Sequence, residues 1–317
     1  MSDQSPDEPF SEPSVPEGLT LAGGLEELTF TPGLDDVLQA SPPPIALVPT
    51  MGALHAGHAA LIERAAEQMR DVAGGIVVVS IFVNPKQFGP GEDFDRYPRT
   101  LNADLKLCRD AGAEIVYAPS VRDMYPDEHL HPGGIATAVQ VRGPLTETLE
   151  GAHRPGHFDG VATVVLKLLN MVRPAVAYFG EKDWQQLAVI NTMANDLNLP
   201  YLIEPVPTIR DDDGLALSSR NHYLSPEQRR IAAELPAALF AARDAIESGV
   251  DPVSVENALA ERLSNAGFAV DYAAVRCPTT LGPPPAKPPF TVRILVAAKL
   301  GDTRLIDNVS ATRSSSA

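Results

Sequence analysis

Long hydrophobic runs, paired cysteines and basic residues are all scarce in this chain of 317 residues. Its apolar segments are shorter than the roughly 20 residues that a membrane-spanning helix needs, and its first residues lack the basic start and apolar stretch of a secretory signal. This pattern predicts a cytoplasmic protein with no membrane partner. The only two cysteines, Cys108 and Cys277, stand far apart and form no C-x-x-C pair. They exclude a disulfide framework, and we expect two ordinary buried or half-buried thiols.

Positive charge is also in short supply, with 25 Lys and Arg residues against 41 Asp and Glu residues and a formal net charge of -16 at pH 7. Proteins that bind a nucleic-acid backbone do so through clustered lysines and arginines. We therefore expect no nucleic-acid partner, and small ligands are favoured instead.

Residues 1–44 form an acidic, proline-rich extension. They contain nine acidic residues, eight prolines and no Lys or Arg. A segment without a periodic apolar face cannot offset the entropy lost on ordering, so we expect this extension to be mostly disordered. Within it, only 25–38 has a pattern compatible with a transient helix.

From residue 45 to about 208, short β-branched runs alternate with amphipathic stretches, which is typical of βαβ units in a parallel α/β sheet with helices on both faces. We expect buried strands at 45–48, 76–83, 114–117, 175–179 and 201–206. Helices are predicted at about 57–69, at 161–172 and from near residue 185. Pro174 follows the second of these and ends it.

The texture changes again after residue 208, and residues 209–317 are predicted to form a smaller α+β domain. Its expected helices span 226–248 and 253–267, with Ser225 and Asp251 as N-cap residues. Strands are expected near 270–275, 292–298 and 304–307. The proline-rich segment 278–289 is interpreted as an irregular connection between two antiparallel strands.

Four polar segments follow, or lie close after, the predicted strands of the first domain. They are P-T-M-G-A-L-H-A-G-H at 49–58, N-P-K-Q-F at 84–88, G-E-K-D-W-Q-Q at 180–186 and G-L-A-L-S-S-R-N at 214–221. Ligands of open parallel sheets bind at the carboxyl ends of the strands, near the helix N-termini that follow. We therefore expect these four segments to converge on one edge of the sheet.

The H-x-G-H element has the most distinctive chemistry. His55 and His58 are three residues apart at a predicted helix start, so both imidazoles can point the same way, and Gly57 lets a nucleotide approach the backbone. Imidazoles and helix-terminal N–H groups together suit a polyphosphate whose charge grows as a bond breaks. Two incidental histidines are the alternative, and a zinc pair fits less well because it prefers i, i+4 spacing with a carboxylate.

Charged and hydroxyl side chains in two other segments fit the same ligand. Lys182 can neutralise phosphate, and Asp183 can accept hydrogen bonds from ribose hydroxyls. Ser218, Ser219 and Arg220 supply hydroxyl and guanidinium donors for phosphate oxygens. Taken singly, the first pair also fits a solvated salt-bridge turn, and the Ser-Ser-Arg sequence also fits a surface loop.

Two glutamines offer groups for a different kind of ligand. The amides of Gln87 and Gln186 can donate to a carboxylate and accept from hydroxyls, which fits a small hydroxy acid. Each glutamine alone is also compatible with an ordinary surface position.

In this order and spacing, the four segments resemble the pantothenate synthetase (pantoate-beta-alanine ligase) family of the nucleotidylyltransferase superfamily, over about residues 45–308. The resemblance implies a Rossmann-like nucleotide- and pantoate-binding domain at 45–208, with the Ser-Ser-Arg phosphate loop carried by the domain at 209–317. It also implies an ATP-dependent ligase with pantoate, beta-alanine and ATP as substrates. Pantoyl adenylate and pyrophosphate form first; beta-alanine then displaces AMP to give pantothenate. Mg2+ on the phosphates and a homodimer are further implications.

The family's site residues transfer to matching positions of this sequence. ATP binding would fall to Met51, Gly52, His55, Gly57, His58, Gly180, Lys182, Asp183, Ile209, Leu217, Ser218, Ser219 and Arg220. The catalytic residues would be His55, His58, Lys182 and Arg220, with His58 in the part of proton donor. Gln87 and Gln186 would bind pantoate, with Asn84 beside it.

Some positions depart from the family pattern. Leu217 replaces a usual methionine, Trp184 a common tyrosine or phenylalanine, and Lys86 a neutral residue near the expected pantoate site. Some relatives place acidic metal-binding residues around 103 and 104, where this chain has only Asp104, so a metal held by the protein is not expected.

Three further histidines have open roles. His129 and His131 fall in 127–134, which we interpret as a loop longer than in similar proteins. His157, with Arg154, is compatible with either a site role or a structural one.

Two other functions stay open at this point. A nucleotidyltransferase acting on a phosphorylated alcohol or a nucleotide would share His55, His58 and Arg220, but it has no use for paired glutamines. A non-catalytic nucleotide-binding scaffold would use the acidic extension to recruit a partner, but it has no need for charged groups at every strand end.

Overall fold

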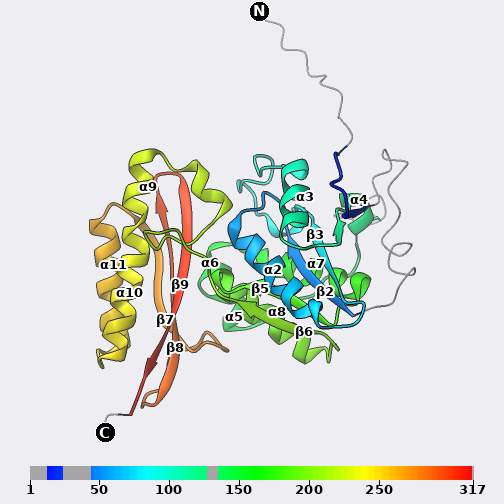
Figure 1. Ribbon diagram of the computed structural model, residues 1–317. Coiled ribbons are helices and arrows are strands. Elements are labelled where there is room, and N and C mark those ends of the chain that lie inside the picture. The colour runs from blue at the N-terminus through cyan, green and yellow to red at the C-terminus, as the bar shows by residue number, and fades with distance from the viewer. Residues whose placement is uncertain (1–12, 24–43, 127–134, 316–317) are drawn as a thin grey trace, which may run out of the picture.

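The computed structural model describes residues 13–23, 44–126 and 135–315, and within them two layered units lie side by side (Figure 1). The larger unit has a central sheet between helices, and the smaller one has helices on one side of a sheet. No helix in these ranges is long and apolar enough to cross a membrane. The two units correspond to the parallel α/β sheet and the smaller α+β domain that the sequence predicts.

The larger sheet has six strands in the order β1-β4-β3-β2-β5-β6, and every neighbouring pair is parallel. Its strands are β1 (Thr20–Ala22), β2 (Ile45–Thr50), β3 (Ile76–Ile81), β4 (Ile115–Tyr117), β5 (Val176–Gly180) and β6 (Leu202–Val206). The five strands expected between residues 45 and 206 are thereby confirmed. Their near-continuous apolar runs are typical of parallel strands buried on both faces.

Helices cover both faces of this sheet. Helices α2 (Ala56–Arg70) and α3 (Leu101–Asp110) lie on one face, and α7 (His157–Val172) and α8 (Trp184–Asp196) lie on the other. Successive side chains of a strand point to opposite faces, so Leu47 packs in the cluster with Leu169 of α7, while Val48 packs with Ile62 of α2. The predicted helices at 57–69, at 161–172 and from near 185 are confirmed.

Strand β1 corrects the expectation for the N-terminal extension. Thr20–Ala22 pairs in parallel with β4, and the side chains of Leu19 and Leu21 are buried at 8% and 7% exposure. The prediction of disorder is wrong for these residues, because the edge of β4 offers unpaired backbone groups and an apolar face that a short segment can cover. The possible helix at 25–38 lies outside the described residues, as does the loop at 127–134 with His129 and His131.

The smaller unit is built on an antiparallel sheet of β7 (Ala269–Arg276), β8 (Phe290–Leu300) and β9 (Thr303–Arg313). Helices α10 (Glu234–Glu247) and α11 (Pro252–Asn265) cover the face of this sheet that is turned away from the larger unit (Figure 1). The proline-rich segment connects β7 to β8, as predicted.

One helix of the smaller unit was predicted without its break. Residues 226–248 form two helices, α9 (Pro226–Ala232) and α10. Pro236 in the first turn of α10 has no N–H and would clash with the carbonyl of Ala232 in a continuous helix. The short helical elements of the described residues are η1 (Pro85–Gln87), α4 (Val121–Met124), α5 (Pro144–Glu147), α6 (Glu150–His153), η2 (Glu181–Asp183) and η3 (Ser219–Tyr223).

The strand order reverses direction at β2. The chain leaves β2 for β3 on one side and returns to the other side of β2 as β5. The carboxyl ends of β2 and β5 therefore border a topological switch point, which is where doubly wound sheets bind ligands. The H-x-G-H segment follows β2, and Lys182 follows β5, so both lie at this position.

Candidate active site

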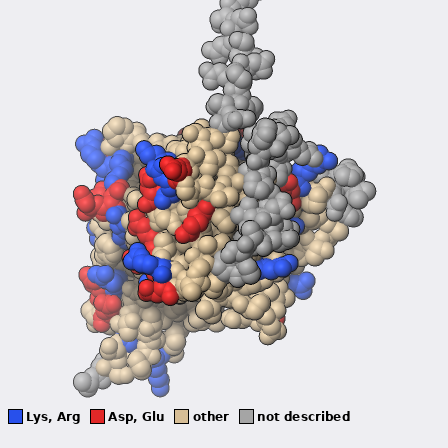
Figure 2. Space-filling model, turned by 45° about the vertical axis from the view of Figure 1, so that its right-hand side comes forward, with Lys and Arg blue, Asp and Glu red and all other residues tan. Residues whose placement is uncertain are grey.

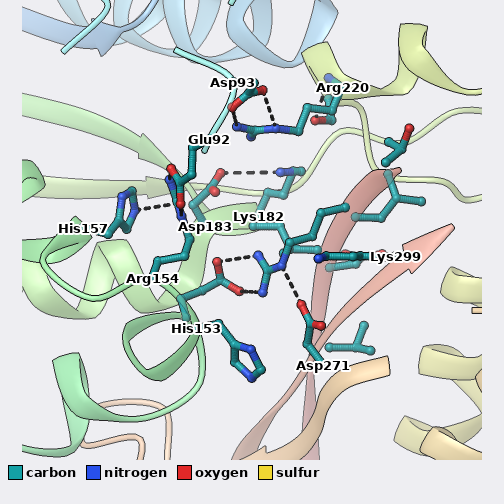
Figure 3. A pocket seen from close by; sticks show the side chains of 18 of the residues that line it. Glu92, Asp93, His153, Arg154, His157, Lys182, Asp183, Arg220, Asp271 and Lys299 are labelled. Carbon is teal, nitrogen blue, oxygen red and sulfur yellow. Dashed lines mark hydrogen bonds and ion pairs between the residues drawn. The ribbon is translucent and has the colours of Figure 1, made fainter. Parts of the chain in front are cut away.

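A cavity of about 710 Å³ is lined by residues of both units. Its wall includes five of the residues predicted to bind substrates, which are Lys182, Asp183, Gln186, Ser218 and Arg220. Figure 3 shows Lys182 in the middle of the labelled group, with the Arg220–Asp93 and Arg154–Glu92 pairs beside it. The structure thus brings the segments at 180–186 and 214–221 together on one cavity.

The other predicted site residues do not contribute to this wall. They are Met51, Gly52, His55, Gly57, His58, Asn84, Gln87, Gly180, Ile209, Leu217 and Ser219. Met51 and Gly52 line a second cavity of about 300 Å³. Leu217 lies close to helix α2, since a Cβ on Gly57 would lie 3.9 Å from Leu217 Cβ. Ile209 is held beside Leu217, because the N–H of Leu217 donates to the carbonyl of Ile209 at 3.0 Å.

The two histidines of the H-x-G-H element cap helix α2. The N–H of Gly57 donates to Nδ1 of His55 at 3.1 Å, and the N–H of His55 donates to Nδ1 of His58 at 3.3 Å. A Cβ on Gly57 would come within 3.0 Å of the His55 ring, so a larger residue there would displace the ring that caps the helix. Because a backbone N–H can only donate, both Nδ1 atoms are acceptors and both protons of the neutral rings sit on Nε2.

Both imidazoles are held in the neutral form. Burial, with the charge of Lys182, lowers the pKa of His55 to about 4. Burial, with His55 and Lys182 as further causes, lowers the pKa of His58 to about 3. The rings lie 4.2 Å apart between centroids. At neutral pH this pair therefore offers two Nε2–H donors rather than two positive charges.

The loop before these histidines is fixed by Asp104. The N–H groups of Ala53 and Leu54 donate to its two carboxylate oxygens at 3.0 and 2.8 Å, and Thr100 Oγ1 donates at 3.1 Å. Ala53 is held at a φ of 51° and Gly52 at 81°, in the left-handed region. Asp104 is 2% exposed, and burial raises its pKa.

Asp104 thus positions the H-x-G-H loop, and its oxygens are occupied by donors from the protein. In the described part of the chain, no group of three or more His, Cys, Asp and Glu side chains is arranged to hold a metal ion.

Lys182 and Asp183 form the turn that links β5 to α8. The Lys182 ammonium lies 3.7 Å from Asp183 Oδ2, and the lysine side chain is 18% exposed. The same ammonium is a cause of the low pKa of both His55 and His58. Lys182 therefore lines the cavity, and its positive charge also helps to keep the two histidines neutral.

Arg220 meets an acidic partner that the sequence analysis did not identify. Its Nε and Nη2 donate to the two oxygens of Asp93 at 3.2 and 2.9 Å, while Ser218 Oγ accepts from the Arg220 N–H at 3.2 Å and caps η3. Arg154 makes a matching pair with Glu92, with two bonds of 2.7 Å. Successive acids of one loop thus hold two arginines of the cavity.

His157 belongs to the Arg154–Glu92 group. Its Nδ1 donates to the Gln87 carbonyl at 2.8 Å, and its Nε2 accepts from Arg154 Nη1 at 3.0 Å. Burial and the charge of Arg154 lower its pKa to about 4. The ring is therefore neutral and braces the segment that carries Gln87.

The amides expected to bind substrate are not equally free. Asn84 is 1% exposed; its Nδ2 donates to Gln87 Oε1 and the Gly160 carbonyl, and its Oδ1 accepts from Tyr125 and the Lys86 N–H. Gln87 Nε2 in turn donates to Met51 Sδ. By contrast, Gln186 lies on the cavity wall, and no hydrogen bond joins its amide to another side chain or carbonyl of the described residues.

Two departures from the family pattern acquire partners. The Lys86 ammonium lies 4.8 Å from the centre of the Tyr125 ring. Trp184 Nε1 donates to the Pro278 carbonyl at 2.8 Å, and the Arg293 guanidinium stacks 3.7 Å from its ring centre. The tryptophan is therefore a contact between the two units.

Several cavity residues escaped the sequence analysis. The acids Glu92 and Asp93 stand in a Gly/Pro-rich segment directly after the N-P-K-Q-F motif. That position next to a site motif is the feature of the sequence that could have identified them. Glu150 and Arg304 form two 2.7 Å bonds across 154 residues of sequence, and Asp271 adds a third bond to Arg304. No local sequence pattern predicts ion pairs between residues so far apart in the chain.

Charges of both signs are intermingled on the face shown in Figure 2, where Lys and Arg side chains lie next to Asp and Glu side chains. The described residues of this face therefore do not form a surface of one charge sign.

The sequence of this chain is similar to that of known proteins. The model of the family described as pantoate-beta-alanine ligase matches residues 33–310. A pantothenate synthetase of a Nocardioides species is 52% identical over 267 residues, covering 84% of this chain and 78% of the relative. One from Mycolicibacterium smegmatis is 53% identical over 266 residues, covering 84% and 80%.

Solved structures are similar as well. The crystal structure of pantothenate synthetase from Thermus thermophilus has a TM-score of 0.81 and 45% identity, covering 92% of this chain and 99% of the other. The ligase from Francisella tularensis, crystallised with beta-gamma ATP and beta-alanine, has a TM-score of 0.73 and 32% identity, covering 92% and 97%.

Proposed function

The chain belongs to the pantoate-beta-alanine ligase family, and from this membership we propose how its residues divide the work of the reaction. The enzyme joins pantoate to beta-alanine at the expense of ATP. In the first step a pantoate carboxylate oxygen attacks the α-phosphorus, the bond to the bridging oxygen breaks, and pyrophosphate leaves with the electron pair. In the second, the amine of beta-alanine attacks the acyl carbon, loses a proton, and displaces AMP.

The observation that carries the assignment of residues is the grouping of phosphate-binding chemistry at the switch point. Lys182 lies on the cavity wall and also acts on His55 and His58. One polyphosphate can thus be shared by the ammonium and two Nε2–H donors at the N-terminus of α2, where the helix dipole also favours negative charge. We assign ATP binding to this group together with Ser218 and Arg220.

We assign His58 the role of hydrogen-bond donor to the departing pyrophosphate. With a pKa of about 3 the ring is neutral at pH 7, so an imidazolium that releases a proton is not the populated form. A preorganised donor aimed at developing charge stabilises the transition state without any proton transfer.

Pantoate is assigned to the glutamines. The free amide of Gln186 can meet the hydroxy acid directly from the cavity wall. Gln87 is held by Asn84 and Met51, so we propose that it contributes as an oriented group and that Asn84 positions it.

Mg2+ is proposed to arrive with ATP, coordinated by phosphate oxygens. Asp104 fits the role of loop anchor rather than of metal ligand, because its oxygens accept three hydrogen bonds from the protein. Chelation by EDTA should therefore abolish turnover without changing the unfolding temperature. We further propose that the enzyme is cytoplasmic and forms a homodimer. Sedimentation equilibrium of the full chain tests the oligomeric state.

Isotope exchange between pyrophosphate and ATP tests the function. Pantoate alone should support exchange, since adenylation precedes the arrival of beta-alanine. Dependence on a phosphorylated alcohol or nucleotide would support the other nucleotidyltransferase. ATP binding with no AMP formed in the presence of both substrates would support the scaffold.

A further inference from the structure

Hydrogen bonds from the smaller unit hold the turn that carries Lys182. Glu181, Lys182 and Asp183 form η2 between β5 and α8, and neither η2 nor α8 has a side-chain cap at its start. The partners that hold this turn come from β8 and β9, more than 100 residues later in the chain.

Asn308 of β9 makes the central contact. Its Nδ2 donates to the main-chain carbonyl of Glu181 at 2.9 Å and to that of Lys182 at 2.8 Å. Asn308 is 3% exposed. Both donor hydrogens of its amide are therefore used on the two peptide groups that precede and follow Lys182 Cα.

Arg293 of β8 fixes the orientation of that amide. Its Nε donates to Asn308 Oδ1, and its Nη2 donates to Glu181 Oε2 at 2.7 Å. A guanidinium can only donate, so the oxygen of the Asn308 amide must face Arg293 and the nitrogen must face the turn. The same guanidinium stacks on Trp184 at 3.7 Å, at the far end of the turn.

We propose that Asn308 is a positioning residue for adenylation, which acts by fixing the main chain of Lys182 so that its ammonium is already aimed at the phosphates. The inference rests on the proposed role of Lys182. A lysine has four rotatable side-chain bonds, so the preorganisation of its charge depends on how firmly its Cα is held. A displacement of about 1 Å at a catalytic group can cost about 100-fold in rate.

The test is pyrophosphate exchange with Asn308→Ala in the full-length enzyme. We expect kcat for exchange to fall by about 10- to 100-fold, with the KM for pantoate changed by less than about threefold. In a Lys182→Ala background, the same substitution should lower the rate by less than about threefold, because the group that it positions is gone. Equal losses in both backgrounds would overturn the proposal.

Asn308→Asp is the second variant. It keeps the size of the side chain and an oxygen for Arg293 but removes both donors to the turn, so we expect a defect like that of Asn308→Ala. Wild-type kcat in Asn308→Asp would overturn the proposal, since the role would then be to hold Arg293. The matched control is Asn191→Ala, which removes an amide donor to the Leu187 carbonyl in α8 and should leave kcat unchanged.

Failure of this inference and failure of the proposed function give different results. No pantoate-dependent exchange in the wild-type enzyme would reject the function. Exchange in the wild type that is equally fast in Asn308→Ala would reject the positioning role alone.

Discussion

The guanidinium of Arg220 and the carboxylate of Asp93 form two hydrogen bonds, of 3.2 and 2.9 Å, that join the segment after η1 to the short helix η3. Burial by itself raises the pKa of Asp93, but hydrogen bonding and the positive charge of Arg220 bring that pKa below its ordinary value. Both residues line the cavity, and Asp93 orients the guanidinium that we assign to phosphate.

Arg220→Ala should destabilise the protein, because it leaves the carboxylate of Asp93, 15% exposed, without its partner. We expect a loss of about 1.5–3 kcal/mol in the free energy of unfolding, measured by urea denaturation. Adding Asp93→Asn should restore part of that loss, since an unpaired neutral amide costs less to bury than an unpaired charge. A double variant that is less stable than Arg220→Ala would contradict this account.

Lys182→Ala should slow adenylate formation steeply while leaving the fold intact. Removal of one preorganised donor costs about 2.7–4 kcal/mol of transition-state stabilisation, or about 100- to 1000-fold in rate. Single-turnover kinetics of pyrophosphate release measure it. Lys106→Ala, which removes an exposed lysine of α3, is the control. An unchanged single-turnover rate would remove Lys182 from the mechanism.

His157 should make the protein less stable in acid. Its pKa is about 4 in the folded chain and 6.5 ordinarily, so between these pH values the unfolded chain binds a proton that the folded chain does not. Stability therefore falls as pH decreases through this window, and at pH 5 the contribution of one such histidine is about 2 kcal/mol below its value at pH 7.5.

Urea denaturation of His157→Gln at the two pH values measures this contribution. The drop in unfolding free energy from pH 7.5 to pH 5 should be smaller than in the wild type by about that amount. His153→Gln, at an exposed position four residues earlier, should show the wild-type drop. A drop in His157→Gln as large as in the wild type would be incompatible with a neutral buried ring.

Two truncations separate the acidic extension from the edge strand. Removal of residues 1–12 should leave turnover unchanged, because that segment offers no candidate ligand, and should leave stability unchanged, because β1 and its buried leucines are kept. Removal of residues 1–23 also deletes β1 and the buried Leu19 and Leu21. Each buried leucine contributes about 1.5–3 kcal/mol to the free energy of unfolding. The urea midpoint should fall in the second truncation only. Equal midpoints in both would show that β1 adds nothing to the sheet.

Much of the fold follows from local patterns in the sequence. The strands at 45–48 and 175–179 could be predicted because strands buried on both faces are continuous apolar runs, and the helix at 161–172 because its apolar positions recur at helical spacing. Strand β1 was missed, since three residues in a proline-rich context carry too short a pattern. These residues form a strand because they pair with β4, and this pairing exists only in the folded sheet.

The chemical groups of the site can be read from the residues alone: the H-x-G-H histidines, Lys182, the Ser-Ser-Arg loop, and their places after the strands. Which of these groups are free and which are held by partners depends on the folded chain. Asp104 became a loop anchor, Asn84 a brace for Gln87, and Asn308 the support of the Lys182 turn. The physical reason is that hydrogen bonds and ion pairs between distant segments depend on distances of a few ångströms, and those distances exist only once the sheet has set the order of its strands.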